Sequence, residues 1–447
     1  MKFKKILSHI TDIRSNKAIR KKILFTLGML ALYRLLVFVP VPFVDINKFI
    51  EILTNGGSAA AGTGLEFFSM LLGGTLDNFS IIGVGLAPYI NASIIMQLLG
   101  TVIPHLEELQ EQGEVGTNKI QQYTRRLSLP LAFMQSIGMV YFINSLLGGS
   151  MIDTGSFGIV LLSAFSLTVG SVIMIWIGEL ITEKGIANGT SLLIFASIIS
   201  GLASQIYTSI AGAAGSGFEV AFVMFIIVIA LVILSVFIIK TTKEIPVIYA
   251  KQGKVQQTAA LPIPLNPVGM VPIIFAIAFI TFPYLISQFV IKFGTPNIMV
   301  EQAAKRIELN FNIYSQQPAA PAIIVYFMLI VVFTFFYTVI VFNPDRMSDN
   351  IQKRGGFIQG IRPGTETAQY LNTIITHLCF WGGIGLGLVG IYSYVLYYLP
   401  FVDIITQSLG SLPVVVTGSG VIIIVGVIQD LINKVNSELD VQKYDKI

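Results

Sequence analysis

The residues best placed to do chemistry lie in one polar stretch, KRGGFIQGIRPG, at positions 353–364. Gly355 and Gly360 have the glycine spacing of a phosphate-binding loop. The stretch also carries three cations, Lys353, Arg354 and Arg362. A Walker A loop, however, needs Lys and then Ser or Thr directly after its second glycine, whereas Ile361 and Arg362 stand there. We therefore expect no nucleotide site, and by itself the stretch indicates a turn-rich, positively charged loop.

Other kinds of active site are also missing from the sequence. The single cysteine, Cys379, excludes an intramolecular disulfide framework, a cysteine-rich zinc site and an iron–sulfur cluster. The three histidines, His9, His105 and His377, are too far apart in sequence for a local metal motif. A membrane protease would need an HExxH motif or paired intramembrane aspartates, and neither occurs. We expect no enzyme, no bound metal and no cofactor.

The composition indicates a membrane protein. Of the 447 residues, 54% are hydrophobic and only 12% are charged, whereas soluble domains carry roughly 25% charged residues. A membrane span needs about 20 mainly apolar residues. Such runs occur at 23–43, 79–102, 124–147, 157–178, 186–207, 219–239, 268–290, 321–342, 368–396 and 412–433. The expected fold is an all-α polytopic membrane protein with ten transmembrane helices.

The distribution of lysine and arginine predicts the orientation of these spans. With the N-terminus inside, almost all of the 28 lysines and arginines fall on inside segments. The outside loops then hold only Lys48, Lys292, Lys305 and Arg306. Because positively charged loops stay in the cytoplasm, both termini are expected to be cytoplasmic. The two largest cytoplasmic loops would be 240–267 and 343–367.

The span count suggests two halves of five spans, with the second inverted relative to the first, as is common in transporters. A short apolar piece at 65–76 precedes the second span and is too short to cross, so it would be re-entrant or capping. The expected domains are a cytoplasmic N-terminal segment at 1–22, an N-terminal half at 23–207, a C-terminal half at 208–434 and a cytoplasmic tail at 435–447.

Apolar stripes run along several spans. Leu86 and Ile90 are four residues apart, as are Thr190 and Ile194, so each pair shares one helix face. Ordinary helix packing explains such stripes, and so does an apolar constriction that gates by excluding water. The spans are nearly free of Asp, Glu and Lys, which argues against an ion-coupled pump. A secondary transporter of a small solute stays open as an alternative to a channel.

Six stretches, in order along the chain, together resemble one family. They are LYRLLVFVPVPFVD, LEFFSMLLGGTLDNFSIIGVGLAPYINASIIMQLL, KIQQYTRRLSLPLAFMQSIG, IWIGELITEKGIANGTSLLIF, LNPVGMVPIIFA and NPDRMSDNIQKRGGFIQGIRPGTETAQYL. From about Ile23 to Lys434 the chain is similar to the SecY family, the channel subunits of bacterial protein translocases. The resemblance implies a central channel that passes unfolded secretory polypeptides across the membrane and releases hydrophobic segments laterally into the bilayer.

The resemblance also assigns sites, around a central pore between two pseudo-symmetric five-helix halves. A pore ring would consist of Leu86, Ile90, Thr190, Ile194, Ile274 and Ile423. A short plug helix at 65–76 would close the external funnel with Leu65, Phe67, Phe68, Met70, Leu71 and Leu72. The lateral gate, between the second and seventh spans, would carry Asn91, Ser93, Gln97, Gln135 and Phe282. Thr190 is the one polar member of the ring, which is still expected to seal.

The family further implies partners. The two large loops would receive the SecA motor ATPase or the ribosome through Lys251, Lys254, Lys353, Arg354 and Arg362. A SecE-like subunit would brace the halves, and a SecG-like subunit would lie at the side. Signal peptides, secretory precursors and the lipid bilayer are the remaining expected partners. The expected location is the bacterial cell membrane.

Overall fold

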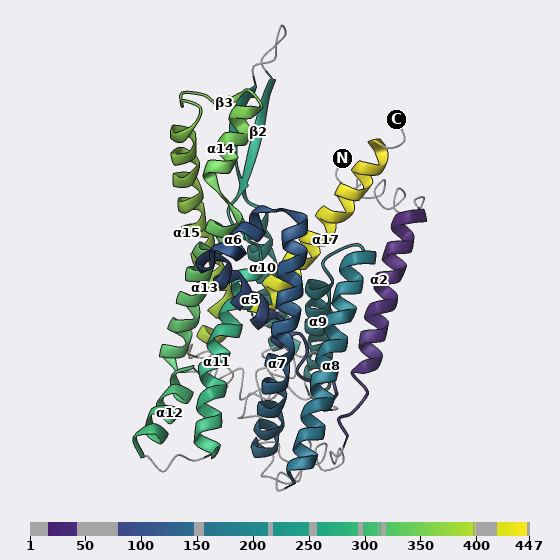
Figure 1. The fold of residues 1–447 in the computed structure, drawn as a ribbon. Helices are drawn as coiled ribbons and strands as arrows, with labels where there is room; N and C mark the ends of the chain where they lie inside the picture. The colour runs from purple at the N-terminus through teal and green to yellow at the C-terminus, as the bar shows by residue number, and fades with distance from the viewer. Residues whose placement is uncertain are drawn as a thin grey trace. The chain divides into compact units, whose positions relative to one another are not determined.

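The computed structural model is predominantly helical (Figure 1). It describes residues 17–42, 79–146, 156–212, 218–249, 257–293, 298–311, 313, 319–396, 398 and 418–444. Each of the ten predicted spans overlaps one long helix. These helices are α2 (Lys17–Leu36), α5 (Ala87–Val102), α7 (Glu114–Leu146), α8 (Phe157–Lys184), α9 (Gly189–Gly212), α10 (Phe218–Lys240), α11 (Val271–Phe293), α13 (Ala320–Val341), α15 (Thr365–Leu396) and α17 (Gly418–Tyr444).

Not all of these helices are apolar over a full membrane thickness. Among the described residues, four stretches qualify by length and composition: Phe157–Lys184, Ala320–Lys353, Thr365–Leu396 and Gly418–Leu439. A fifth is α5 taken with α6 (Pro104–Glu111), although the pair bends by 106°. Three shorter apolar stretches are Gly189–Gly201, Ile226–Lys240 and Val271–Thr281. The bend between α5 and α6 falls at Ile103, directly before Pro104, because a residue before proline is driven out of helical geometry.

The chain forms two compact units. The first contains Met1–Gly212, Thr281–Pro318 and Val427–Ile447, and the second contains Ala213–Ile280 and Ala319–Gly426. In the first unit α7 packs against α5 and α8, and α8 packs against α2 and α9. A buried hydrogen bond of 2.8 Å joins the Tyr33 hydroxyl on α2 to the Ser197 hydroxyl on α9. The helix α2 is therefore held by a polar contact as well as by apolar burial.

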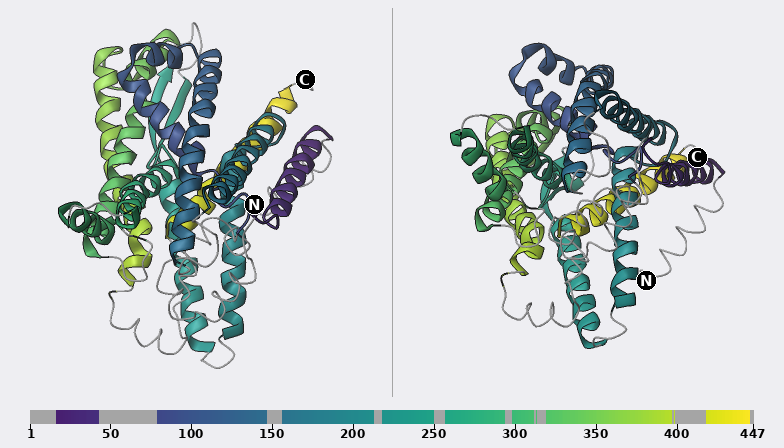
Figure 2. Two further views of the ribbon diagram at one scale, coloured as in Figure 1. Left: turned by 60° about the horizontal axis from the view of Figure 1, so that its bottom comes forward. Right: turned by 90° about the horizontal axis from the view of Figure 1, so that it is seen from below.

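In the second unit, α13 and α15 run side by side (Figure 1 and Figure 2). Three glycines of α15 face α13: a Cβ on Gly383, Gly387 or Gly390 would approach Thr334, Phe327 or Ile330, respectively. Small residues at such an interface let two helices approach closely, as is typical of helices that pack against each other in a membrane. Two further helices are α12 (Ile298–Phe311), assigned to the first unit, and α14 (Pro344–Lys353), in the second.

The expectation of an entirely helical fold missed a three-stranded sheet. Its strands are β1 (Thr242–Tyr249), β2 (Gln257–Pro264) and β3 (Gly356–Ile358), in the order β2-β1-β3, and all pairs are antiparallel. Ile245 and Val247 point into a shared core, which is the alternation that marks a half-buried strand. Pro246 masked this signal because proline is normally excluded from the middle of a sheet, yet here it pairs with Ala260.

Candidate functional site

The α8–α9 hairpin brings two glycines into contact. A Cβ on Gly189 would overlap the carbonyl oxygen of Gly178, so only glycine fits at this crossing. The Thr182 hydroxyl donates to the Gly178 carbonyl over 2.8 Å and accepts from the Gly189 amide over 2.8 Å. The GELITE and GIANG parts of the sequence therefore form one structural unit that fixes where α9 begins.

Two of the predicted ring residues, Thr190 and Ile194, lie on the first turns of α9. The Thr190 hydroxyl donates to Oδ1 of Asn188 over 2.6 Å, and the same oxygen accepts from the Ser191 amide over 3.2 Å. Asn188 thus caps the helix N-terminus, where backbone amides lack partners within the helix. Ile194 follows one turn later and is half-buried.

Two more ring residues begin α5. Leu86 occupies the N-cap position and is buried, while Ile90 is half-buried and donates its amide to the Leu86 carbonyl over 3.0 Å. Pro88, in the first turn of α5, has no amide proton to leave unpaired there. Leu86, Ile90, Thr190 and Ile194 all belong to the first unit.

The remaining two ring residues belong to the second unit. Ile274 lies in α11, half-buried, and its amide donates to the Met270 carbonyl over 3.4 Å. Ile423 lies in α17 and is buried. The two helices approach each other at Gly426, where a Cβ would stand 3.2 Å from the Cβ of Met270. The entry to α11 and the first part of α17 are therefore packed together within this unit.

The predicted gate residues are placed mainly on α5 and α7, which pack against each other. Asn91 is buried, and the Gln97 amide donates to the Ser93 hydroxyl over 3.3 Å. Oε1 of Gln97 is buried and has no hydrogen-bond partner among the described residues. Gln135 is half-buried on α7, and Phe282 lies on α11 directly before Pro283. The Ser93–Gln97 contact lies within α5, so it links no second helix.

An ion pair connects two of the family-like stretches, KIQQYTRRLS and IWIGELITE. Arg125 on α7 reaches Glu179 on α8 with Nε at 2.9 Å from Oε1 and Nη2 at 2.6 Å from Oε2. Such a two-pronged contact is the strong form of an arginine–carboxylate pair. Both side chains are partly open to solvent, however, which weakens the attraction. The pair orients α7 against α8 rather than offering a free charge.

The stretch KRGGFIQGIRPG forms the end of α14, strand β3 and the turns that lead to α15. Three of its glycines have positive φ: Gly355 at 68°, Gly360 at 81° and Gly364 at 104°. A Cβ on Gly356 would instead strike the ring of Tyr249 on β1. The Ser348 hydroxyl donates to the Gly364 carbonyl over 2.6 Å and so ties the last turn back to α14. The glycines therefore serve turns and close packing.

The cations of this stretch point outward. Lys353, Arg354 and Arg362 are all exposed. Arg362 Nη1 lies 3.9 Å from Glu366 Oε1, but the arginine side chain is 87% exposed, so this pair does not neutralise it. The Arg362 carbonyl accepts a hydrogen bond of 2.8 Å from Thr367, which fixes the backbone beneath the side chain. We call Lys353, Arg354 and Arg362 the basic tip.

The two long loops form a single body beneath the basic tip. Strand β3 from the second loop pairs with β1 from the first, with Val247 opposite Ile358. Their shared core is apolar and includes Ile245, Val247, Ile263, Ile351, Ile358, Leu371, Ile374 and Ile375. Sequence alone predicted two separate loops, because neither loop carries a local pattern that indicates pairing with a strand about a hundred residues away.

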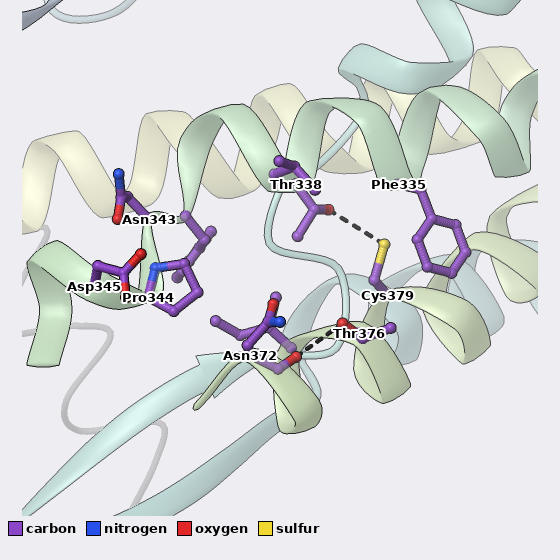
Figure 3. A pocket seen from close by; sticks show the side chains of 11 residues that line it. Phe335, Thr338, Asn343, Pro344, Asp345, Asn372, Thr376 and Cys379 are labelled. Atoms are coloured by element: carbon purple, nitrogen blue, oxygen red, sulfur yellow. Dashed lines mark hydrogen bonds between the residues drawn. The ribbon is translucent and has the colours of Figure 1, made fainter. Parts of the chain in front are cut away.

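A cavity of about 240 Å³ lies beside this body, between α13, α14 and α15 (Figure 3). Eleven residues line it, among them Phe335, Asn343 and Asn372. The lone cysteine is one of them: Cys379 is buried and its Sγ donates to the Thr338 hydroxyl over 3.3 Å. None of the predicted site residues lines this cavity.

Several predicted site residues lie outside the described residues. These are the plug residues Leu65, Phe67, Phe68, Met70, Leu71 and Leu72, together with Lys251 and Lys254 of the first cytoplasmic loop.

The comparison with known families decides what this arrangement is. The family model of SecY matches residues 80–432. The protein translocase subunit SecY of Bacillus licheniformis is 36% identical over 448 residues, which cover 97% of this chain and 98% of the relative. This chain belongs to the SecY family. Membership confirms the prediction of a translocase subunit rather than an enzyme, and it removes the reason to keep a small-solute transporter as an alternative.

Solved structures agree with this SecY-family fold. A SecY protein whose plug domain stabilises the closed state of the translocation channel superposes with a TM-score of 0.61 at 20% identity, covering 95% of this chain and 93% of that one. Sec61 in the canine ribosome–channel complex gives a TM-score of 0.57 at 18% identity over the same shares. The prediction of a mainly helical, multi-pass membrane protein is therefore confirmed.

Sequence reasoning about this SecY-family chain missed Asn188, which contacts the predicted ring residue Thr190. Its signal is present: an asparagine followed by Gly-Thr-Ser at the start of an apolar helix is a typical N-cap pattern. In the sequence, this pattern served only as part of the resemblance to the family. The contact between Asn188 and the Thr190 hydroxyl became visible only in the structure.

Proposed function

We infer that this chain is the protein-conducting channel subunit of a Sec translocase, which passes unfolded polypeptides through the membrane and releases hydrophobic segments into it. The observation that carries this function is membership of the SecY family, matched over residues 80–432 and by a relative aligned along almost the whole chain. The bundle of long helices supplies the scaffold that such a channel needs.

We propose that Leu86, Ile90, Thr190, Ile194, Ile274 and Ile423 form the constriction. Five carry large aliphatic side chains, which seal around an extended polypeptide without binding a particular sequence, and which exclude water when the channel rests. As in the SecY family, the constriction would lie between two five-span halves, which the sequence divides at 23–207 and 208–434.

The plug and the lateral gate complete the proposed channel. The 65–76 segment would close the external side. The gate would open between the second and seventh spans, with Asn91, Ser93, Gln97 and Gln135 as polar contacts on the N-terminal side and Phe282 on α11. Gln97 Oε1 supports this role: it is buried and has no hydrogen-bond partner in the part of the chain that the structure describes, so it is available to a partner when the gate changes state.

The basic tip would receive the SecA motor ATPase or the ribosome, together with Lys251 and Lys254. Its support is the exposure of Lys353, Arg354 and Arg362 on a backbone that the sheet and the Ser348 and Thr367 hydrogen bonds hold in place. This proposal places both termini in the cytoplasm and adds SecE-like and SecG-like subunits as membrane partners.

Site-specific crosslinking tests the constriction. A photoreactive residue at Ile90 or Ile274 should form adducts with a stalled secretory precursor, because each would lie within contact distance of the polypeptide. Val339 is a matched control: it lies on α13, is 75% exposed and should crosslink to lipid instead. Efficient translocation without an adduct from either isoleucine would remove these residues from the constriction.

A further inference from the structure

Thr190 carries the one hydroxyl among the proposed ring residues, and both heavy substituents on its Cβ are engaged within the first unit. Oγ1 donates to Asn188 Oδ1 over 2.6 Å. Cγ2 faces α8, 3.3 Å from the position that a Cβ would take on Gly178. Apart from Cα, only a hydrogen is left on Cβ. The side of Thr190 that faces neither Asn188 nor Gly178 therefore carries neither the hydroxyl nor the methyl group.

Asn188 is held for this contact by the start of the helix. Its Oδ1 also accepts from the Ser191 amide over 3.2 Å, and its own carbonyl accepts from the Leu192 amide over 3.1 Å. A carboxamide oxygen has two lone pairs, so it can accept from both donors at once. The residue that caps α9 is thus also the residue that fixes the rotamer of Thr190.

Gly178 supports the same rotamer from the opposite side. A Cβ there would crowd the Thr190 methyl group and would lie 3.4 Å from Leu193 Cδ1. The methyl group packs onto α8 because position 178 has no side chain. Two residues that are not members of the ring, Asn188 and Gly178, therefore determine how its polar member is turned.

We propose that Asn188 is a positioning residue of the constriction, which holds the Thr190 hydroxyl on the helix cap so that its proton is donated to Asn188. This inference rests on the proposed function, because it requires Thr190 to belong to the ring. An apolar constriction gates by excluding water. A hydroxyl released from the cap can donate to water and accept from it, and threonine in a helix readily changes between two rotamers. The cap thereby takes up the proton of the Thr190 hydroxyl, which is then not donated to water in the constriction.

The test measures the resting ion leak of the translocase, purified with its small subunits and reconstituted into proteoliposomes. Asn188→Gly removes the acceptor but keeps the helix, because glycine is tolerated at an N-cap. We expect its leak to rise about fivefold, the factor set by one net hydrogen bond. Asn188→Asp retains an acceptor in the same place and should restore the low leak.

A second pair of variants separates the hydroxyl from a general disturbance of α9. Thr190→Val removes the hydroxyl, so adding Asn188→Gly to it should cause no further leak. If Asn188→Gly raises the leak equally in the parent chain and in the chain that carries Thr190→Val, the effect does not pass through the hydroxyl and the inference is wrong.

Ile194→Gly distinguishes this inference from the proposed ring. It deletes a large apolar side chain of the ring and should leak whether or not Asn188 matters. If Ile194→Gly leaks and Asn188→Gly does not, the ring stands and the positioning role of Asn188 is refuted. If Ile194→Gly does not leak, the ring itself is wrong and the role of Asn188 is refuted with it.

Discussion

The α8–α9 hairpin and the basic tip both depend on glycine, but for different physical reasons. In the hairpin, Gly178 and Gly189 remove side-chain bulk so that two backbones can touch. In the tip, Gly355, Gly360 and Gly364 provide positive φ angles in open turns. The hairpin glycines hold two spans together, whereas the tip glycines shape a surface. A substitution should therefore damage assembly in the first region and only local geometry in the second.

The largest effect is expected for Gly189→Ala. The added Cβ would collide with the Gly178 carbonyl, which is backbone and cannot rotate away. Overpacking of this kind costs about 1–3 kcal/mol or more, so the thermal midpoint and the yield of assembled translocase should fall. Gly158→Ala on α8 is the matched control, because open space surrounds that position. Equal stability of the two variants would show that the close crossing is unimportant.

Gly364→Ala should have a smaller and more local effect. A φ of 104° strains any residue with a Cβ, at a cost of about 1–3 kcal/mol. Because the glycine lies in an exposed turn, the strain should appear as faster amide hydrogen exchange in β3 and the first turn of α15, with little change in the unfolding of the bundle. The control is Gly138→Ala within α7, where space is open and helix propensity improves. Faster exchange across the whole second unit would contradict a local role.

Arg362→Glu should reduce binding of the cytoplasmic partner without destabilising the chain. The side chain is 87% exposed, and an exposed i,i+4 pair contributes at most about 0.5 kcal/mol. Affinity for SecA or the ribosome should fall several-fold, and the loss should shrink at high salt, which screens surface charge. Glu366→Gln removes the same ion pair but keeps the arginine, so it should bind normally. Equal losses in the two variants would assign the effect to the pair rather than to the cation.

The smallest effect is expected for Arg125→Gln. Its pair with Glu179 is two-pronged but partly exposed, and such pairs contribute about 0.2–1 kcal/mol. The thermal midpoint should fall slightly at low salt and match the parent at high salt, while partner binding stays normal. Weaker partner binding at unchanged stability would show instead that Arg125 contributes to docking of the partner rather than to the packing of α7 against α8.

The sequence predicted the long helices well because apolar runs of membrane length leave few other structures. It also predicted no nucleotide site in the KRGGFIQGIRPG stretch, since the residues after Gly360 do not follow the Walker A pattern. The sequence could not tell which glycines are needed for close packing and which for positive φ angles. Gly189 and Gly355 can be distinguished only once their surroundings in the structure are known. Nor could it pair β1 with β3, which lie about a hundred residues apart and share no local signal.

The candidate site was predictable to the extent that family motifs carried it. Thr190 and Ile194 were placed at the start of a helix, and the structure puts them there. The direction of the Thr190 hydroxyl was not predictable, because it depends on a side-chain contact with Asn188 and on the absence of a side chain at Gly178. Periodicity identifies a helix face but does not fix a rotamer.

The pairing of β1 with β3 has a mechanical consequence. Strand β1 begins directly after α10, and the Leu265 amide at the end of β2 returns to the Thr241 carbonyl over 2.7 Å, just before α11. Strand β3 is joined through short turns to α14, which follows α13, and to α15. A load applied to either loop is therefore shared by four helices instead of bending one. A force applied anywhere on the sheet would therefore reach the ends of all four helices together.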